Sequence, residues 1–368
     1  MHNNFRCKFN SDEKITFTFK YLIVLSHQHI LIIRLSALGD VSMALPVIRA
    51  LTEQHPDCKI TVVSKPFFKP IFEGVANVSF FAAEVTSRHK GFLGLYRLYR
   101  ELKKEKITHI ADFHNVIRSK ILRLFFVLNG KPTAFINKDR AGKKALTSTR
   151  NKIFKQLKTS HQRYADVLNE LGFATNLSNP TLIEKKLFPE KLISLVGLKE
   201  NKWVGIAPFA AFEGKIYPLN LMEEVIEEIT SKGLKIFLFG GGKHEVEILN
   251  AIENKYHNVL TIAGKLSFSD ELLLMSFLDL MISMDSGNAH LSAMQQVKTI
   301  TLWGVTHPFA GFAPFHQPSD YCLISDLKKY PKIPCSIYGN KVFEGYENVM
   351  KTISPTKVIE KVITVLNT

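Results

Sequence analysis

The stretch ILIIRLSALGDVSMALPVIRAL, residues 30–51, decides the fold of this chain. An apolar run leads into a short turn of small residues, and a helical pattern begins at once. Continuous apolar runs are typical of strands buried on both faces, so the stretch predicts the first strand and helix of a parallel sheet. Asp40 stands where the turn meets the helix. Its carboxylate either caps the helix or takes part in chemistry, and the stretch alone leaves both alternatives open.

The same alternation continues on both sides of a loose segment at 174–200. Alternating strands and helices predict parallel sheets that carry helices on both faces. Ligands of such sheets bind at the carboxyl ends of the strands. The expected strands are 29–35, 59–64, 78–82, 108–113, 203–207, 234–239, 259–262, 278–284 and 299–303, and the expected helices are 41–54, 66–73, 91–105, 116–128, 219–232, 243–254, 269–276, 288–295 and 355–366.

The length of 368 residues favours two domains over one. We expect a flexible N-terminal extension at 1–28, a first domain at 29–185 and a second domain at 186–368. The final helix, 355–366, is expected to cross back onto the first domain. The predicted fold class is α/β, with two doubly wound, Rossmann-like domains facing each other across a cleft.

Charge is distributed unevenly between the two halves. Residues 1–185 carry 30 Lys and Arg against 14 Asp and Glu, a balance of +16, and the remaining 18 basic and 19 acidic residues give −1. Twenty of the basic residues lie between Arg88 and Arg163. Such a positive field suits nucleic acid, an anionic membrane surface or a phosphorylated substrate, and a merely solvated basic face is the plain alternative.

The four cysteines are scattered and form no CxxC pair. Their spacing indicates neither a disulfide framework nor a zinc site and favours a reducing cytosol. The sequence has no DxD pair to hold a divalent ion on a diphosphate, so we expect no metal. No apolar run reaches the roughly 20 residues that span a bilayer.

Two loops of the second half follow predicted strands and are candidates for binding an anionic ligand. In APFAAFEGKIYPL the small residues Ala210 and Ala211 let backbone N–H groups approach a phosphate, and Lys215 supplies a charge. In FGGGKHEVE three glycines permit a tight turn, and Glu245 follows. That carboxylate either accepts bonds from ribose hydroxyls or simply favours the first turn of a helix.

A third loop, ISMDSGNAHLSAM, ends a strand and opens a helix. Backbone amides at Ser286 and Gly287 would point at an anion, and the helix dipole would add to the attraction. Asp285 would repel a phosphate, so its carboxylate suits sugar hydroxyls beside one, or caps the helix. For His290, one turn later, we favour packing beneath the loop.

These motifs together resemble a known family. LIIRLSALGDVSMALPVIRAL, the Lys215 loop with Tyr217, FGGGKHE and MDSGNAHLSAMQQVKTITLWGVTHP are similar to the ADP-heptose:lipopolysaccharide heptosyltransferases of glycosyltransferase family 9. The resemblance implies an inverting glycosyltransferase of the two-domain GT-B fold. It further implies a nucleotide-sugar donor, ADP-heptose, and a phosphorylated lipid A/Kdo-type acceptor, with no cofactor and no metal. A cytoplasmic enzyme, bound peripherally to the anionic surface of the inner membrane, is implied as well.

The resemblance also assigns roles to residues. Asp40 becomes the general base on the acceptor hydroxyl. The implied donor-binding residues are Ala210, Ala211, Lys215, Glu245, Leu266, Asp285, Ser286 and Gly287, and the implied basic residues facing the acceptor or the donor phosphates are Arg34, Arg118, Lys120 and Arg140.

The chain departs from the family at the donor loop. Ala210 and Ala211 stand where members often have hydroxyl residues, and Tyr217 replaces a common tryptophan. A related GT-B enzyme that uses another nucleotide sugar is therefore one alternative, and an inactive relative is another. A nucleic-acid-binding protein using the basic half is the non-enzymatic alternative. The chain has no recognised reader motif, so no nucleic-acid partner is expected.

Overall fold

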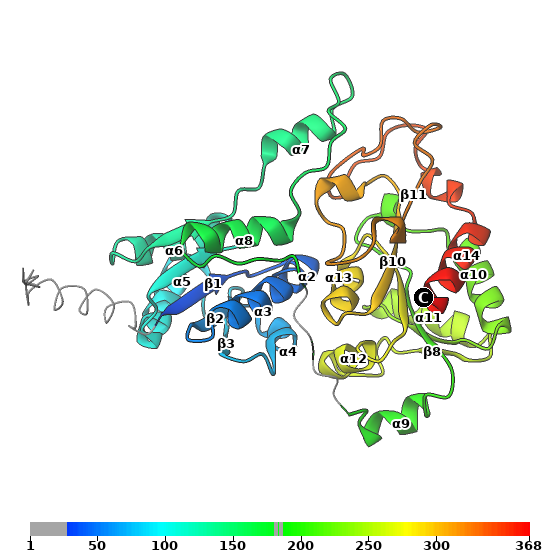
Figure 1. The fold of residues 1–368 in the computed structure, drawn as a ribbon, viewed down its shortest axis with the longest axis horizontal. Coiled ribbons are helices and arrows are strands. Elements are labelled where there is room, and N and C mark those ends of the chain that lie inside the picture. The colour runs from blue at the N-terminus through cyan, green and yellow to red at the C-terminus, as the bar shows by residue number, and fades with distance from the viewer. Residues whose placement is uncertain (1–27, 180–182, 184–186) are drawn as a thin grey trace, which may run out of the picture.

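The computed structural model describes residues 28–179, 183 and 187–368, and it forms two α/β units that lie side by side (Figure 1). The predicted N-terminal extension and the predicted boundary at 185/186 fall on or beside residues outside this description. The chain passes from the first unit to the second between α8 (Ser160–Glu170) and α9 (Glu190–Val196).

The first unit contains a five-stranded sheet in the order β3-β2-β1-β4-β5. Every neighbouring pair is parallel, and β1 lies at the centre between β2 and β4. The opening apolar run therefore supplies the central strand, and every residue of β1 after His29 is buried. The strands are β1 (His29–Ile33), β2 (Lys59–Ser64), β3 (Val78–Ala82), β4 (His109–Asp112) and β5 (Thr133–Phe135).

The second unit contains a six-stranded sheet in the order β11-β10-β9-β6-β7-β8, again with parallel neighbours. Two doubly wound parallel sheets were the predicted architecture, and this prediction is confirmed. The strands are β6 (Trp203–Ala207), β7 (Lys235–Leu238), β8 (Val259–Thr261), β9 (Leu280–Met284), β10 (Lys298–Trp303) and β11 (Cys322–Ile324).

Helices cover both faces of each sheet. On one face of the first sheet, α5 and α6 bury Leu95, Leu98 and Leu122 against β1 and β4. The helices are α2 (Leu38–Ser42), α3 (Ala44–Gln54), α4 (Lys69–Phe72), α5 (Gly91–Leu102), α6 (Ile117–Val127), α7 (Arg140–Leu146), α8, α9, α10 (Leu219–Ser231), α11 (Lys243–Glu253), α12 (Phe268–Met275), α13 (Gly287–Met294) and α14 (Pro355–Asn367). In the described residues no helix combines the length and apolar character that crossing a bilayer requires.

The two units share one hydrophobic core. A single buried cluster runs from Leu45 and Tyr164 in the first unit to Met281 and Leu291 in the second. At the junction, α2 packs against α13 and α4 packs against α12. Arg49 also donates a hydrogen bond of 2.6 Å to the carbonyl of Met294 across this junction. The carboxyl edge of the first sheet therefore lies directly against the helices that begin at the carboxyl edge of the second (Figure 1).

The expectation for the final helix is wrong. Helix α14 packs against α10, β9 and β10 of the second unit instead of crossing back to the first. The reason lies in its buried face, because Val358, Val362 and Val365 recur at helical spacing and join the second unit's own core.

Candidate active site

Asp40 lies at the carboxyl edge of the first sheet, in the first turn of α2. The N-cap residue is Ala37, and no side chain caps the helix, so the capping alternative for Asp40 is wrong. Its carboxylate forms an ion pair with the guanidinium of Arg34, just after β1. The Asp40 side chain is 34% exposed and that of Arg34 only 7%. A buried cation thus holds a carboxylate that remains open to solvent.

Arg34, which follows β1, is held by residues from two other elements. Its Nη1 donates a hydrogen bond of 2.7 Å to the carbonyl of Phe113, just after β4, and its guanidinium lies 5.9 Å from the ring centre of Tyr164 on α8. The Tyr164 ring stacks on Phe113 at 4.4 Å, and its hydroxyl donates to the backbone carbonyl of Asp40 at 3.2 Å. Burial raises the pKa of Tyr164, which keeps this hydroxyl a donor. The position of the Asp40 carboxylate therefore depends on β1, β4 and α8 together.

A second ion pair lies at the carboxyl edge of the second sheet. Lys215, in the 3₁₀ turn Glu213–Lys215, contacts Asp285 after β9 with an Nζ–Oδ2 distance of 2.9 Å. Thr306, after β10, donates to the same carboxylate oxygen at 2.8 Å. The side chains of Lys215 and Asp285 are 12% and 7% exposed. The stem of Lys215 also crosses Gly339, whose φ of +87° and lack of a side chain leave the necessary space.

The two ion pairs come together at the α2–α13 junction. A Cβ atom on Gly39 would lie 2.9 Å from Cδ2 of His290, so the turn before Asp40 rests directly on α13. His290 is buried, as expected for a packing residue, and its Nδ1 has no hydrogen-bond partner. Burial lowers its pKa to about 4, while Asp285 and Asp40 both oppose this shift. The charges of both carboxylates act on the pKa of the same imidazole, and the Asp40 turn contacts that ring. The structure therefore brings Asp40 and the Asp285 loop together.

The start of α13 suits an anion. Ser286 is the N-cap residue but makes no side-chain cap bond to the helix. Its hydroxyl instead pairs with that of Ser283 at 3.1 Å. Gly287 opens the helix, so the first-turn amides are not taken by a capping side chain, and the helix dipole adds positive potential at this end.

The other predicted donor residues lie on loops of the same sheet. Ala210 is partly buried, Ala211 is exposed, and Leu266 packs partly buried against the core shared by the two units. Glu245 lies in the first turn of α11 and accepts a hydrogen bond of 2.8 Å from the backbone N–H of Gly241. This position agrees with the alternative in which the carboxylate favours the start of a helix. Contacts of these four residues with a donor remain predictions.

Tyr217 has a structural role. It is fully buried and donates a hydrogen bond of 2.7 Å to the carbonyl of Ile353. Tyrosine in place of the family's common tryptophan at this position therefore affects a contact inside the second unit.

Several basic side chains surround the Arg34 pair. Burial lowers the pKa of His114 to about 3, and the charges of Arg34, Lys138 and Arg118 push it the same way. Arg118 is exposed at the start of α6. Lys120 follows two positions later, which rotates its side chain by about 200° around the helix. The structure thus brings Arg34 and Arg118 together, whereas Lys120 points in another direction.

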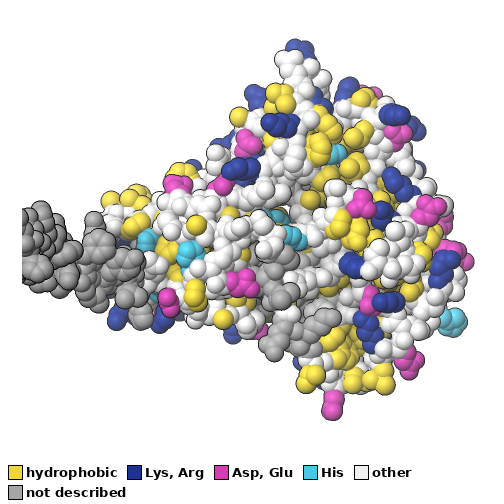
Figure 2. Space-filling view, viewed as in Figure 1, with side chains coloured by type: hydrophobic (Ala, Val, Ile, Leu, Met, Phe, Trp, Pro, Cys, Tyr) yellow, Lys and Arg dark blue, Asp and Glu magenta, His cyan; other side chains and the backbone are white. Residues whose placement is uncertain are grey.

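A projecting segment, residues 137–159 with α7, contributes further cations (Figures 1 and 2). Lys143 of this α7 arm lies 4.8 Å from the ring centre of Phe312 and 5.5 Å from that of Tyr338, both in the second unit. Burial lowers the pKa of Lys143 to about 8, and the charge of Asp40 opposes the shift. Burial and Asp40 also raise the pKa of Tyr338, and the charge of Arg140 opposes that shift. The α7 arm and the second unit therefore meet beside Asp40.

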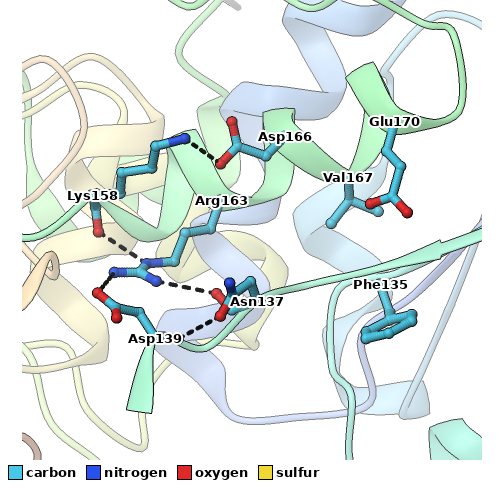
Figure 3. A pocket seen from close by; sticks show the side chains of 8 residues that line it. All are labelled: Phe135, Asn137, Asp139, Lys158, Arg163, Asp166, Val167 and Glu170. Atoms are coloured by element: carbon cyan, nitrogen blue, oxygen red, sulfur yellow. Dashed lines mark hydrogen bonds and ion pairs between the residues drawn. The ribbon is translucent and has the colours of Figure 1, made fainter. Parts of the chain in front are cut away.

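Both ends of the α7 arm are held by Arg163 of α8 (Figure 3). This buried guanidinium donates to the carbonyls of Lys158 at 3.0 Å and Asn137 at 3.1 Å, and pairs with Asp139 at 3.2 Å. A cavity of about 230 Å³ lies at this point. It is lined by both acidic and basic side chains and is not formed by the residues around Asp40.

Sequence reasoning missed Lys138, Lys143, Tyr164, Thr306 and Tyr338. A signal existed for Tyr164, because the capping box of Thr159 and Gln162 announces the start of α8. The two lysines lay unassigned in the basic stretch, and the roles of Thr306 and Tyr338 arise only from tertiary contacts. No cluster of three or more His, Cys, Asp or Glu able to hold a metal ion is found in the described residues, and metal independence remains a prediction.

Comparison with known proteins gives consistent matches. The profile of glycosyltransferase family 9 (heptosyltransferase) matches residues 95–336. Lipooligosaccharide heptosyltransferase 2 of Campylobacter jejuni subsp. jejuni serotype O:2 is 26% identical over 334 residues, covering 88% of this chain and 94% of that protein. The glycosyl transferase family 9 structure from Veillonella parvula has a TM-score of 0.71 at 21% identity, covering 92% of this chain and 97% of that one. E. coli heptosyltransferase WaaC, solved with ADP, has a TM-score of 0.66 at 16% identity, with coverage of 92% and 100%.

The profile covers more than half of the chain, and the solved structures share its arrangement of two parallel-sheet units. These matches confirm the predicted resemblance, the GT-B fold and the enzyme class. The chain therefore belongs to glycosyltransferase family 9, the heptosyltransferase family, and is a glycosyltransferase.

Proposed function

We propose that this enzyme transfers a heptose from ADP-heptose to a phosphorylated lipid A/Kdo-type acceptor of the lipopolysaccharide inner core. Transfer inverts the anomeric carbon and needs neither a metal ion nor a resident cofactor. The Campylobacter relative is named a lipooligosaccharide heptosyltransferase, which supports heptose as the transferred sugar. The E. coli relative was solved with ADP, which supports ADP as the nucleotide of the donor. The enzyme would act in the cytoplasm, bound peripherally to the inner membrane.

One observation carries the proposal: the solvent-open carboxylate of Asp40 lies at the same junction as the Lys215–Asp285 pair. In an inverting transfer Asp40 accepts the proton of the acceptor hydroxyl while that oxygen bonds to the anomeric carbon. The bond from this carbon to the diphosphate breaks, and ADP leaves. A hydrolase would instead need two free carboxylates flanking the bond, whereas Asp285 is buried and already accepts from Lys215 and Thr306.

The second unit would stabilise the leaving group. The Lys215 ammonium and the uncapped start of α13 supply positive charge where the diphosphate charge develops. Asp285 fixes the direction of Lys215 and suits the donor's sugar hydroxyls. The cations Arg118, Lys138 and Lys143 are available to the phosphates of the acceptor.

The proposal is tested with purified enzyme, ADP-heptose and a Kdo-lipid A acceptor. We expect ADP release, a new glycosidic bond of inverted configuration by NMR, and the same rate in the presence of EDTA. Retained configuration, or loss of activity that Mg²⁺ restores, would overturn the mechanism.

A related GT-B enzyme with another nucleotide sugar is the second candidate, favoured by Ala210 and Ala211 in the donor loop. Calorimetric titration with ADP, UDP and GDP separates the two. Selective binding of ADP supports the heptosyl donor, and preference for UDP or GDP supports the alternative.

A further inference from the structure

Helix α6 carries an apolar stripe that faces solvent. Ile117, Leu124 and Leu128 recur at i, i+7 and i+11, which places them on one side of the helix. Ile117 is 77% exposed and Leu128 is 73% exposed. The opposite side of α6 buries Leu122 and Phe126 in the core. The helix therefore has two apolar sides, and the fold uses only one of them.

Helix α5 continues this surface. Phe92, Leu93 and Tyr96 lie on its outer side, and Leu93 is 81% exposed. Phe125 of α6 connects the two helices, since its ring centre lies 5.6 Å from that of Phe92 and 5.5 Å from that of Tyr96. We call this joint surface of α5 and α6 the α5–α6 face. Figure 2 shows hydrophobic side chains at the end of the first unit where Figure 1 places these helices.

Basic side chains border the apolar residues. A groove of about 620 Å³ between the helices has Tyr99 and Phe125 in its lining, together with Arg100, Lys103 and Lys104. Helix α6 contains three basic residues and no acidic residue, and one of the three, Arg123, is paired with the buried Asp112. The segment Gly91–Glu105 adds four basic residues against two acidic ones, of which Glu101 is paired with Arg88. Exposed large apolar side chains surrounded by Lys and Arg match a surface that is itself part apolar and part anionic.

The α5–α6 face also has a useful relation to the active site. Both helices begin after the carboxyl ends of their preceding strands, β3 and β4, at the edge of the sheet where Asp40 lies. Ile117 at the start of α6 is followed by Arg118, whose charge acts at His114 beside the Arg34 pair. A planar surface contacting this face would therefore reach the edge of the catalytic region.

We propose that the α5–α6 face binds the surface of an anionic phospholipid bilayer, with its leucines and aromatic rings in the interfacial layer and its Lys and Arg at the headgroup phosphates. This surface assignment extends the proposed function, but its test does not depend on heptosyl transfer.

The test is flotation of the full-length enzyme with vesicles of phosphatidylcholine alone or with 30 mol% phosphatidylglycerol, a composition of about one anionic lipid in three. We expect co-flotation with the anionic vesicles and its loss in high salt. The variant Arg100→Gln/Lys104→Gln should bind about 25-fold more weakly, at about fivefold for each charge. The variant Leu93→Ser/Leu124→Ser/Leu128→Ser should bind at least about tenfold more weakly.

Matched controls come from the second unit. Leu198→Ser removes an exposed leucine, and Lys328→Gln/Lys329→Gln removes two exposed charges. Both should bind vesicles as the unchanged enzyme does. With an acceptor embedded in vesicles, only the α5–α6 variants should lose transfer, and they should retain it with a deacylated, water-soluble acceptor.

Three results would overturn the assignment. The first is equal flotation of the α5–α6 variants and the controls. The second is equal binding to neutral and anionic vesicles. The third is a concentration-dependent dimer that the leucine variant abolishes, because the face would then bind a second copy. Flotation without any transferase activity would instead overturn the proposed function and leave this surface assignment standing.

Discussion

The two halves of the candidate active site use the same pairing of a carboxylate with a cation, at different depths. In the first unit the Asp40 carboxylate is one third exposed and the buried Arg34 holds it from below. In the second unit both Lys215 and Asp285 are nearly buried, and Thr306 adds a further bond. The basic surroundings add to this difference, because the charges of Arg118 and Lys138 act on His114 beside the first pair and Asp40 acts on Lys143.

This difference indicates that the two pairs have different roles. A carboxylate open on one side can meet an incoming hydroxyl and receive its proton. A buried pair whose carboxylate also accepts a bond from Thr306 is held in place, and it suits a group that must present charge to a bound diphosphate without moving. The predictions below test whether the two pairs act separately, beginning with the largest expected effect.

Replacing Asp40 with Asn should lower kcat by about 10²–10⁴-fold, because the base is lost while the amide keeps an oxygen for Arg34. ADP affinity should stay unchanged, since the donor pair is intact. Steady-state transfer assays and ADP calorimetry measure both quantities. Asp57→Asn, an exposed carboxylate of the same unit, is the control. Full turnover in the Asp40 variant would remove the base assignment.

Replacing Lys215 with Met should weaken ADP binding by about 10–150-fold, the worth of a charge-assisted hydrogen bond. Arg34→Met should leave ADP affinity unchanged and reduce only turnover. Calorimetry on the two variants, with circular dichroism to check folding, makes the comparison direct. If both variants lower ADP affinity equally, the two pairs do not have separate roles.

Lys143 should give the acceptor KM a pH dependence. With its pKa lowered to about 8, the lysine is charged below that pH and loses its charge as the pH rises to 9. Attraction of acceptor phosphates then weakens, and KM should rise by about two- to fivefold. In Lys143→Arg the charge persists and the rise should disappear. KM measured from pH 7 to 9 tests this, and an identical rise in both proteins would exclude Lys143 as its source.

Thr306→Val should have the smallest effect. It removes one hydrogen bond to a carboxylate that keeps its lysine, so the free energy of unfolding should fall by about 1 kcal/mol. Chemical denaturation measures the loss. Thr364→Val, at an exposed position of α14, is the matched control and should change stability less. An equal loss in both variants would mean that Thr306 adds nothing specific to the second pair.

Much of the fold was predictable because its central strands are buried on both faces. Strand β1 is a continuous apolar run after His29, and in β9 only Ser283 interrupts the apolar residues. The edge strands β5 and β11 were missed, since each has three residues with only the middle one buried. The predicted helix at 41–54 is divided into α2 and α3 at Met43, a detail that apolar periodicity does not show.

The site was predictable where a residue follows a strand, and not elsewhere. Asp40, Lys215 and Asp285 all lie in segments that follow parallel strands, so topology alone places each of them at the carboxyl edge of its own sheet. Lys143 and Tyr338 come from segments far apart in the chain and acquire their place only where the α7 arm meets the second unit. No local pattern announces such a contact.

Arg163 ties the two ends of the α7 arm together, so a change in the length of its outer part need not move the points where the arm joins the first unit. The outer part is held instead by the second unit, through Lys143 beside the Phe312 and Tyr338 rings and through Lys152, which donates to the carbonyls of Lys332 and Pro334. The arm is therefore a bridge between the two units, and substitutions in its outer part should alter the region beside Asp40 without unfolding either sheet.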